Sequence, residues 1–321
     1  MANTSNNSRQ IVKVSGKLTK VGDLDTWRGL TATFVASCQV KQSSRLLYVR
    51  TLIQFFKWVE DSKKNLPTLT STDILEYRDS LEASGRSNLT IGSYLVTVRE
   101  FYAWAEGRGL YRNIAKGIKT PRRKKDEFVK QHLSDEQAAA LLDFYKDRSL
   151  RDYAIVNLML RTGLRTIEVV RADIEDITYR GGNRILKIWG KGNEAKDDYV
   201  MLTDKAYIPI HNYLITRKGA KGGEPLFCSE SHQNSGKRLT TRTISQICKD
   251  GLRGIGLDCR EFSAHSLRHT TACSMLMHGA SLMQVQYSLR HNSPLTTEIY
   301  LKSLKKENIL SNSYQLLDSA F

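Results

Sequence analysis

Two short segments of the sequence combine arginine with groups that could handle a phosphate. In the run TGLRTIE, Arg165 directly follows a Gly-Leu pair and stands three residues before Glu168. This spacing is typical of a helix start at which the glutamate orients the arginine from the next turn. In the run HSLRH, His265 and Arg268 are three residues apart and therefore share one face of a helix. A planar guanidinium and an imidazole that donates or carries a proton could together hold a phosphate.

Both patterns also have a simpler interpretation. An ion pair on the protein surface would give the same Arg165–Glu168 spacing. His265 and His269 are four residues apart, which also suits zinc, but the run lacks the glutamate of a zinc-protease helix and places an arginine beside the metal. We therefore favour phosphate over metal, and we expect His269 to be a hydrogen-bonded packing residue.

A lysine, a further histidine and a tyrosine complete the set of candidate residues. Lys191 is flanked by glycines between two strand-like runs, a pattern typical of a β-hairpin. Lys187 and Lys196 are close by, and we choose Lys191 because glycines bracket it. His291 stands nine residues before Tyr300. Because the chain has 14 tyrosines, local propensity does not single out Tyr300.

The charge of the chain points to a polyanionic partner. Its 321 residues include 49 Lys and Arg against 33 Asp and Glu, which gives a formal net charge of +16. Residues 1–131 hold 23 basic and 12 acidic residues, or +11, and residues 132–321 hold 26 and 21, or +5. Nucleic acid is the first candidate partner and an anionic membrane the second, while an inert basic surface is the simplest alternative.

Several protein classes are disfavoured by composition. No run approaches the roughly 18 apolar residues of a membrane span, and the N-terminus lacks the apolar stretch of a secretory signal. The five cysteines form no CxxC pair, which argues against a disulfide scaffold or a cysteine-based zinc site and favours a reducing cytosol.

Amphipathic periods divide the chain into two folded regions. We expect a flexible basic arm over residues 1–20, a helical domain over 21–118, a basic linker over 119–131 and a second domain with a C-terminal tail over 132–321. In the first domain apolar residues recur at three- and four-residue spacings within 23–38, within 43–62, and from Thr72 and Asn88 or Thr90 onward. The aromatic residues at these spacings are expected to form a core rather than a base-stacking platform.

The second domain is expected to mix helices with a few strands. Ser134 and Gln137 have the spacing of a capping box at a new helix start. The predicted helices cover 134–146, 151–162, 203–217, 240–253, 265–278 and 281–290. The predicted strands cover 184–189, 198–202 and 225–228.

The order of the motifs is more specific than any one of them. TGLR, a glycine-flanked hairpin lysine, HSLRH, LRH and a final tyrosine follow one another over about 140 residues. This series resembles the tyrosine recombinase (phage integrase) family, strongly over residues 134–301 and more weakly over the helical N-terminal part. The resemblance implies two domains: an all-α, SAM-like core-binding bundle, and a mainly α catalytic domain with a small antiparallel β-sheet.

The resemblance also implies a role for each candidate residue. Arg165 and Arg268 would clamp the scissile phosphate, with Glu168 supporting the first arginine. Lys191 would be the general acid and His265 the general base. His291 would donate a hydrogen bond to a phosphate oxygen, and Tyr300 would be the nucleophile. One departure is visible: the family usually has glycine before the second histidine, where this chain has Arg290. We expect Arg290 to contact DNA or to point outward, without touching the catalytic set.

By the same resemblance, the chain would cut and rejoin double-stranded DNA at a specific recombination site. It would form a 3′-phosphotyrosyl intermediate without metal, ATP or another cofactor, as a homo-tetramer on two sites. Accessory DNA-bending or directionality proteins are possible partners, the expected location is the cytoplasm at the nucleoid, and no membrane is involved. Residues 309–317 could dock on a neighbouring subunit or pack on their own domain. The candidate DNA contacts are Arg86, Arg122, Arg123, Lys124, Lys125 and Arg242.

Several functions stay open at this point. The leading hypothesis is an integrase of a mobile element or a resolvase of the Xer type. A type IB topoisomerase would share the nucleophile and the phosphate clamp but relax DNA as a monomer. A DNA-binding protein without catalysis is disfavoured by the full set of candidate residues, and a metal-dependent nuclease by the lack of clustered acids.

Overall fold

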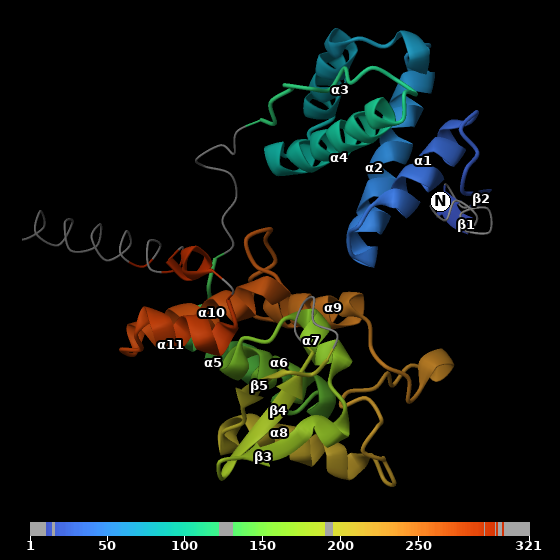
Figure 1. Ribbon diagram of the computed structural model, residues 1–321. Coiled ribbons are helices and arrows are strands. Elements are labelled where there is room, and N and C mark those ends of the chain that lie inside the picture. Colours follow the sequence, from blue (N-terminus) through green and yellow to red (C-terminus); the bar gives the residue numbers. More distant parts are fainter. Residues whose placement is uncertain are drawn as a thin grey trace, which may run out of the picture. The chain divides into compact units, whose positions relative to one another are not determined.

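The computed structural model describes residues 11–14, 17–121, 131–189, 195–291 and 293–298, together with Tyr300 and Leu304. The chain divides into two compact units, Met1–Glu127 and Phe128–Phe321 (Figure 1). Each unit has its own apolar core. The fold is therefore best understood one unit at a time.

The N-terminal unit is built mainly from helices, as the apolar periods predict. Its described helices are α1 (Trp27–Ser37), α2 (Gln42–Asp61), α3 (Ser71–Ala83) and α4 (Asn88–Gly107), with a 3-10 turn, η2 (Leu66–Thr68), before α3. The first helix begins later than expected because Thr26 caps it, its side chain accepting a hydrogen bond from the Gly29 amide.

Aromatic side chains fill the core of this unit. Those of Phe34, Phe56 and Phe101 are almost wholly buried, and Phe101 meets the other two edge to face. Such edge-to-face pairs are the favoured geometry of packed rings. The prediction that these aromatic residues form a core is confirmed.

The segment before α1 differs from the expected arm. Residues Ile11–Val14 and Lys17–Lys20 form two paired antiparallel strands, β1 and β2, rather than a flexible extension. Val14 is fully buried against Val21 and Ala32, so one apolar residue ties the strands to α1. The polar and basic composition of this stretch hides that contact from sequence analysis.

The C-terminal unit is mostly helical. Its described helices are α5 (Asp135–Lys146), α6 (Leu150–Thr162), α7 (Thr166–Arg171), α8 (Asp204–Thr216), α9 (Thr241–Gly254), α10 (Ala264–Met277) and α11 (Leu282–Leu289), with 3-10 turns η3 (Ile174–Asp176) and η4 (His232–Asn234). The predicted capping box is present at α5, where the Gln137 amide donates to the Ser134 side chain and the Ser134 amide donates back to Gln137. Among the described helices, none has the length and apolar character to cross a membrane.

A small sheet lies beside these helices. Within the described residues it has three antiparallel strands in the order β3 (Ile177–Arg180), β4 (Asn183–Ile188) and β5 (Asp198–Met201). The first strand escapes sequence analysis because it is short and partly exposed along its whole length. The strand predicted over 225–228 is wrong: Pro225 and Cys228 make only isolated bridges, to Asp173 and Arg238.

Helix α6 runs through the core of this unit and delivers the first candidate residues. It packs against α5, α8 and α10, and Ile155 and Leu158 on it are fully buried. In Figure 1, α10 and α11 lie side by side. The ends of α6 and α11 and the body of α10 thus bring the TGLR, LRH and HSLRH motifs together.

Candidate active site

Arg165 lies where α6 ends and α7 begins, as the spacing predicts. Its backbone amide and its Nη1 both donate to Glu168, to Oε2 and Oε1 respectively, each at 2.8 Å. Glu168 is fully buried, whereas the Arg165 side chain keeps 29% of its surface exposed. The glutamate therefore fixes one edge of the guanidinium and leaves the side chain partly open to a ligand.

The glycine of the TGLR motif is required by both conformation and space. Gly163 ends α6 in the left-handed region, at φ 62° and ψ 24°. A Cβ there would come within 2.4 Å of the Leu289 Cδ2 atom on α11. Glycine adopts this backbone conformation readily and leaves room for the buried Leu289 side chain.

Arg268 is held in the interior by two backbone carbonyls. It is 2% exposed, its Nη1 donates to the Gly163 carbonyl at 2.5 Å, and its Nη2 donates to the Leu289 carbonyl. It thus joins the end of α6 to the end of α11. Burial, together with the charges of Arg165 and Arg290, lowers the pKa of Arg268 to about 10, so it stays cationic at neutral pH.

The two candidate histidines have different surroundings. His265 is exposed near the start of α10. His291 is buried just after α11, and its Nδ1 lies 2.8 Å from the Thr297 hydroxyl. Burial and the charge of Arg268 lower the pKa of His291 to about 4, so this imidazole is neutral at pH 7. Thr297 was not a candidate in the sequence, and the six-residue separation from His291 gives no recognisable motif.

Tyr300 is packed inside the unit rather than presented at its surface. It is 4% exposed and belongs to an apolar cluster with Cys273 on α10 and Leu289 on α11. Burial raises the pKa of Tyr300 above its ordinary value, although the charges of Arg268 and Arg165 act to lower it. In this structure the phenol is therefore protonated and covered.

His269 packs directly on the tyrosine, which extends the packing role expected for it. Its ring lies edge-on to the Tyr300 ring with centroids 4.6 Å apart, and 5.3 Å from the ring of His265. Burial and the nearby His265 lower the pKa of His269 to about 4. A neutral imidazole thus separates the exposed His265 from the buried Tyr300.

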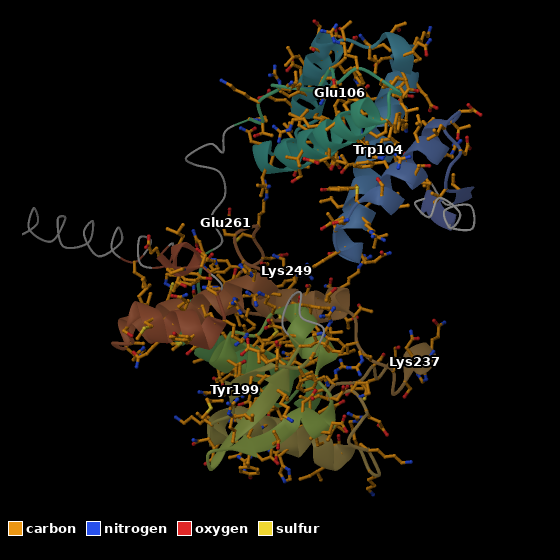
Figure 2. The ribbon with its side chains drawn as sticks, in the orientation of Figure 1. Trp104, Glu106, Tyr199, Lys237, Lys249 and Glu261 are labelled. Atoms are coloured by element: carbon orange, nitrogen blue, oxygen red, sulfur yellow. The ribbon has the colours of Figure 1, made fainter. Side chains whose placement is uncertain are left out.

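An open cavity of about 730 Å³ joins the candidate phosphate residues to α9. Arg165, His265 and Arg268 line one side of it. Arg242 and Lys249 on α9 line another, and Figure 2 labels Lys249 on this helix. Arg260 lines it as well, so six side chains that can carry positive charge border the cavity.

Three groups of candidates lie outside the described residues or in the other unit. Lys191, and with it the linker residues Arg122, Arg123, Lys124 and Lys125, fall outside the described residues. Arg86 belongs to the N-terminal unit, where it is exposed between α3 and α4. The structure thus brings together every described catalytic candidate, and Arg242 is the one described candidate DNA contact in the same unit.

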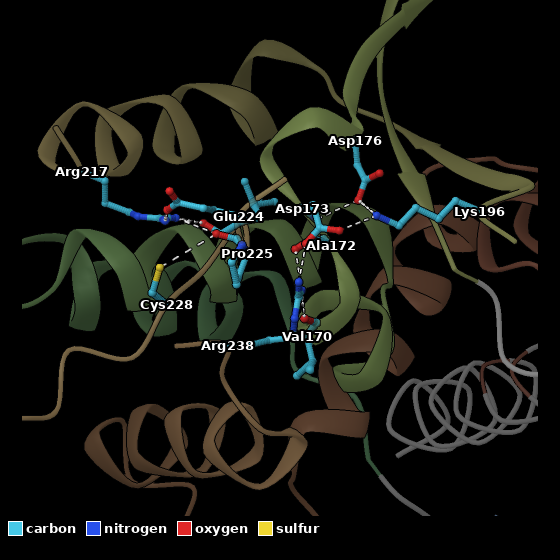
Figure 3. Close-up of polar contacts among 11 residues, drawn as sticks. Val170, Ala172, Asp173, Asp176, Lys196, Arg217, Glu224, Pro225, Cys228 and Arg238 are labelled. Atoms are coloured by element: carbon cyan, nitrogen blue, oxygen red, sulfur yellow. Dashed lines mark hydrogen bonds and ion pairs between the residues drawn. The ribbon is translucent and has the colours of Figure 1, made fainter. Parts of the chain in front are cut away.

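The two lysines that compete with Lys191 are both described. Lys196 is held between the carboxylates of Asp173 and Asp176, with Nζ 2.6 Å from an oxygen of each (Figure 3). Burial works to lower the pKa of Lys196, but hydrogen bonds to the two carboxylates raise it above the ordinary value. Such a lysine is a poor proton donor at neutral pH. Lys187 is exposed on β4.

The expectation for Arg290 is wrong. Its side chain is 7% exposed, and its Nη2 donates to Oε2 of Glu168 at 2.9 Å. It therefore touches the carboxylate that also holds Arg165, rather than pointing outward. The sequence gives no signal for this contact because the two residues are 122 positions apart.

Comparison with known families identifies the chain. The model of the phage integrase family matches residues 131–307, and that of the phage integrase N-terminal SAM-like domain matches residues 31–109. The chain is a tyrosine recombinase of the phage integrase family. It is thus an enzyme of the class that cleaves and rejoins DNA at specific sites.

Individual relatives agree with this assignment. The recombinase is 33% identical to tyrosine recombinase XerC of Pelobacter propionicus over 259 residues, which cover 79% of this chain and 82% of the relative. It is 29% identical to tyrosine recombinase XerA of Pyrococcus furiosus, with 76% of this chain and 82% of the relative covered.

Solved structures share the fold of this recombinase. The XerH site-specific recombinase in its post-cleavage complex superposes with a TM-score of 0.71 at 21% identity, covering 90% of this chain and 84% of the other. The Tn1549 transposon integrase with transposon right end DNA gives 0.66 at 17% identity, covering 87% and 96%. The expected two-domain architecture is thereby confirmed.

Proposed function

We propose that this recombinase cuts one DNA strand at a time through a 3′-phosphotyrosyl intermediate formed by Tyr300. The observation that carries the proposal is the convergence of Arg165, Arg268 and His265 on one cavity, with Tyr300 packed behind them. Two arginines beside a tyrosine suit phosphoryl transfer, because they stabilise the charge that grows on the non-bridging oxygens.

The reaction can be written with these groups alone. The Tyr300 oxygen attacks phosphorus and forms a phosphate ester, while the bond to the 5′-oxygen breaks. Once Tyr300 is uncovered, His265 accepts the tyrosine proton, and Lys191 gives a proton to the leaving oxygen. A 5′-hydroxyl from another strand then attacks the phosphotyrosine and releases Tyr300. The energy of the broken linkage is kept in the ester, so neither ATP nor a metal enters any step.

The burial and protonation of two groups support two further proposed roles. His291 is neutral at pH 7, so it serves as a hydrogen-bond donor to a phosphate oxygen rather than as a cation. Tyr300 is covered and protonated in the structure. We propose that DNA binding uncovers it, which would prevent the tyrosine from reacting in the absence of a site.

The partner in this proposal is double-stranded DNA carrying a specific recombination site. The net charge of +16 and the arginine-lined cavity favour a polyanion. The solved relatives include XerH bound to its difH substrate and the Tn1549 integrase with transposon DNA. Arg86, Arg242 and the linker residues Arg122, Arg123, Lys124 and Lys125 are proposed to contact the duplex.

The assembly and biological role follow from the same family. We propose a homo-tetramer on two sites, with accessory DNA-bending or directionality proteins as further partners. The reaction would serve integration and excision of a mobile element, or resolution, on DNA in the cytoplasm at the nucleoid. Residues 309–317 are the candidate contact to a neighbouring subunit.

A covalent-trapping experiment tests the mechanism. Duplexes bound by the protein are selected from a randomised pool, and nicked versions are incubated in EDTA and run on a denaturing gel. We expect a protein–DNA adduct with the wild type and with Tyr287→Phe, an exposed tyrosine on α11, but none with Tyr300→Phe.

Other outcomes would contradict the proposal. An adduct that persists in Tyr300→Phe, or that forms only with added metal, would exclude Tyr300 as the nucleophile in a metal-free reaction. Tight binding with no adduct at any nick position would mean a binding protein. Relaxation of supercoiled plasmids that lack the selected site would favour the topoisomerase alternative.

A further inference from the structure

The residue before His291 has an unusual backbone conformation for its type. Arg290 ends α11 at φ 57° and ψ 50°, in the left-handed region. Within the described residues, Lys63 is the one other non-glycine residue with positive φ. A side chain at such a position is unfavourable relative to glycine, because its Cβ crowds the backbone. The contacts of the Arg290 side chain must therefore compensate for this unfavourable backbone conformation.

The side chain of Arg290 is directed at the protein. Nη1 donates to the Ser288 carbonyl at 2.7 Å, and Nη2 donates to Glu168 Oε2 at 2.9 Å. Nε is buried without a hydrogen-bond partner, 3.9 Å from a carboxylate oxygen of Asp198 on β5. Two of its three nitrogens are thus occupied by protein groups, and Arg290, unlike Arg165 and Arg268, is not among the residues that line the cavity.

The contact with Glu168 completes the surroundings of a buried carboxylate. Oε1 accepts from the Arg165 side chain, and Oε2 accepts from both the Arg165 amide and Arg290. Burial acts to raise the pKa of Glu168, but the charge of Arg290, followed by the amide and charge of Arg165, holds it below the ordinary value. Both oxygens are thereby locked in place, and so is the edge of Arg165 that they hold.

The backbone at position 290 touches the rest of the candidate site. The preceding Leu289 carbonyl accepts from Arg268, and the following residue is His291. Arg290 therefore lies between Leu289, which binds Arg268, and His291, and its side chain contacts Glu168, which binds Arg165. Its side chain links the end of α11 to Glu168 on α7, and no other contact described above joins these two helices.

We propose that Arg290 is a positioning residue of this recombinase: it fixes Glu168, and through Glu168 it holds Arg165 in the orientation that binds the scissile phosphate. The inference rests on the proposed function, since it assigns Arg165 to the phosphate. Arg290 itself acts through Glu168 and does not contact DNA. A glycine would suit the backbone better but would leave the carboxylate with Arg165 as its one cationic partner among the contacts described here.

Arg290→Gly tests the inference, because it removes the side chain and relieves the backbone at once. Lys63→Gly is the matched control: it makes the same change of charge and backbone freedom in the other unit. On the selected nicked duplex at saturating concentration, we expect Arg290→Gly to slow single-turnover cleavage by about 10- to 100-fold, since small misplacements of a catalytic group have this effect. Lys63→Gly should cleave at the wild-type rate, and both variants should retain a cooperative thermal transition.

A double-mutant cycle separates positioning from other roles. If Arg290 acts through Glu168, adding Arg290→Gly to Glu168→Gln should slow cleavage by less than about threefold, because the two changes remove one shared interaction. Arg290→Asn also tolerates positive φ but carries no charge, so it should lose as much rate as the glycine variant. The Kd for the duplex should stay within about twofold of wild type in all of them.

Three outcomes would overturn the inference. One is cleavage by Arg290→Gly or Arg290→Asn at the wild-type rate. Another is a full loss of rate on adding Arg290→Gly to Glu168→Gln. The third is a weaker Kd with a salt dependence reduced by about one phosphate contact and an unchanged saturated rate, which would make Arg290 a DNA-contacting residue. Failure of the proposed function itself gives a different result, because the wild type would then form no adduct in EDTA, or the adduct would persist in Tyr300→Phe.

Discussion

Two clusters of charged residues in the C-terminal unit look alike in composition but differ in balance. Around Asp173, two carboxylates face two cations, Lys196 and Arg238, in the arrangement of Figure 3. Around Glu168, one carboxylate faces Arg165 and Arg290, and the cationic Arg268 lies close enough for their charges to lower its pKa. The first cluster is neutral and the second carries excess positive charge.

The balance indicates what each cluster can do. Arg238 turns its donors to Asp173 and to the carbonyls of Val170 and Ala172, so the first cluster satisfies itself and ties the segment after α7 to the sheet. The second cluster has more cations than carboxylates, and Arg165 keeps part of its surface open to a cavity. Excess positive charge around a buried carboxylate therefore distinguishes the proposed phosphate site, whereas matched charge is typical of a structural contact.

The largest effect is expected from removing one arginine of each cluster. Arg165→Ala should reduce single-turnover cleavage by about 1,000-fold, because a fixed donor is lost where charge grows in the transition state. Arg238→Ala should leave the saturated rate within about threefold of wild type and lower Tm instead. Measured side by side on the selected nicked duplex, equal losses of rate would remove the distinction between the clusters.

A smaller effect is expected from neutralising the carboxylates. Glu168→Gln should slow cleavage by about 10- to 100-fold and destabilise the unit by about 2–3 kcal/mol, because it leaves two arginines without a buried counter-charge. Asp173→Asn should cost about 1 kcal/mol without loss of rate, since its partners are partly exposed. Urea unfolding and cleavage assays on both variants test this. A wild-type rate in Glu168→Gln would show that Arg165 keeps its orientation without the glutamate charge.

The contrast between the clusters also explains how far sequence could lead. The Arg165–Glu168 contact is local, and a three-residue spacing at a helix start predicts it correctly. The His265 and Arg268 pair on α10 is likewise local, and both residues line one cavity as expected. The amphipathic helices could be predicted for the same reason, because each period is contained in a short stretch of chain.

The features that could not be predicted from the sequence depend on contacts between residues far apart in the chain. Arg290 and Glu168 are brought together by the packing of α11 against α6, where Gly163 admits the Leu289 side chain. The burial of Tyr300 depends on α10 and α11 in the same way. The hairpin of β1 and β2 depends on the packing of Val14 against α1. The polar stretch around Val14 has no sustained alternation of apolar and polar residues from which this contact could be predicted.

The smallest expected effect is a difference in pH dependence between the clusters. The pKa of Glu168 is held below its ordinary value by Arg290 and Arg165 against the effect of burial, and that of Asp173 by hydrogen bonds from Lys196 and Arg238 against the same effect. Each carboxylate therefore adds stability that is fully present above its unfolded pKa and is lost as the pH falls toward its folded pKa. The charges facing Glu168 come from the α6–α7 junction, α10 and the end of α11, in Arg165, Arg268 and Arg290.

Added salt should distinguish the contribution of Glu168 to stability from that of Asp173. We expect the free energy of unfolding, measured by urea titration between about pH 3 and pH 6, to fall less steeply toward acid in both Glu168→Gln and Asp173→Asn than in wild type. In about 1 M NaCl the difference due to Asp173 should shrink, because its partly exposed pairs are screened, whereas that due to the buried Glu168 should persist. If salt removed both differences equally, the Glu168 cluster would be as accessible to solvent as the Asp173 cluster. The burial of Glu168 would then not explain how Arg165 is held in place.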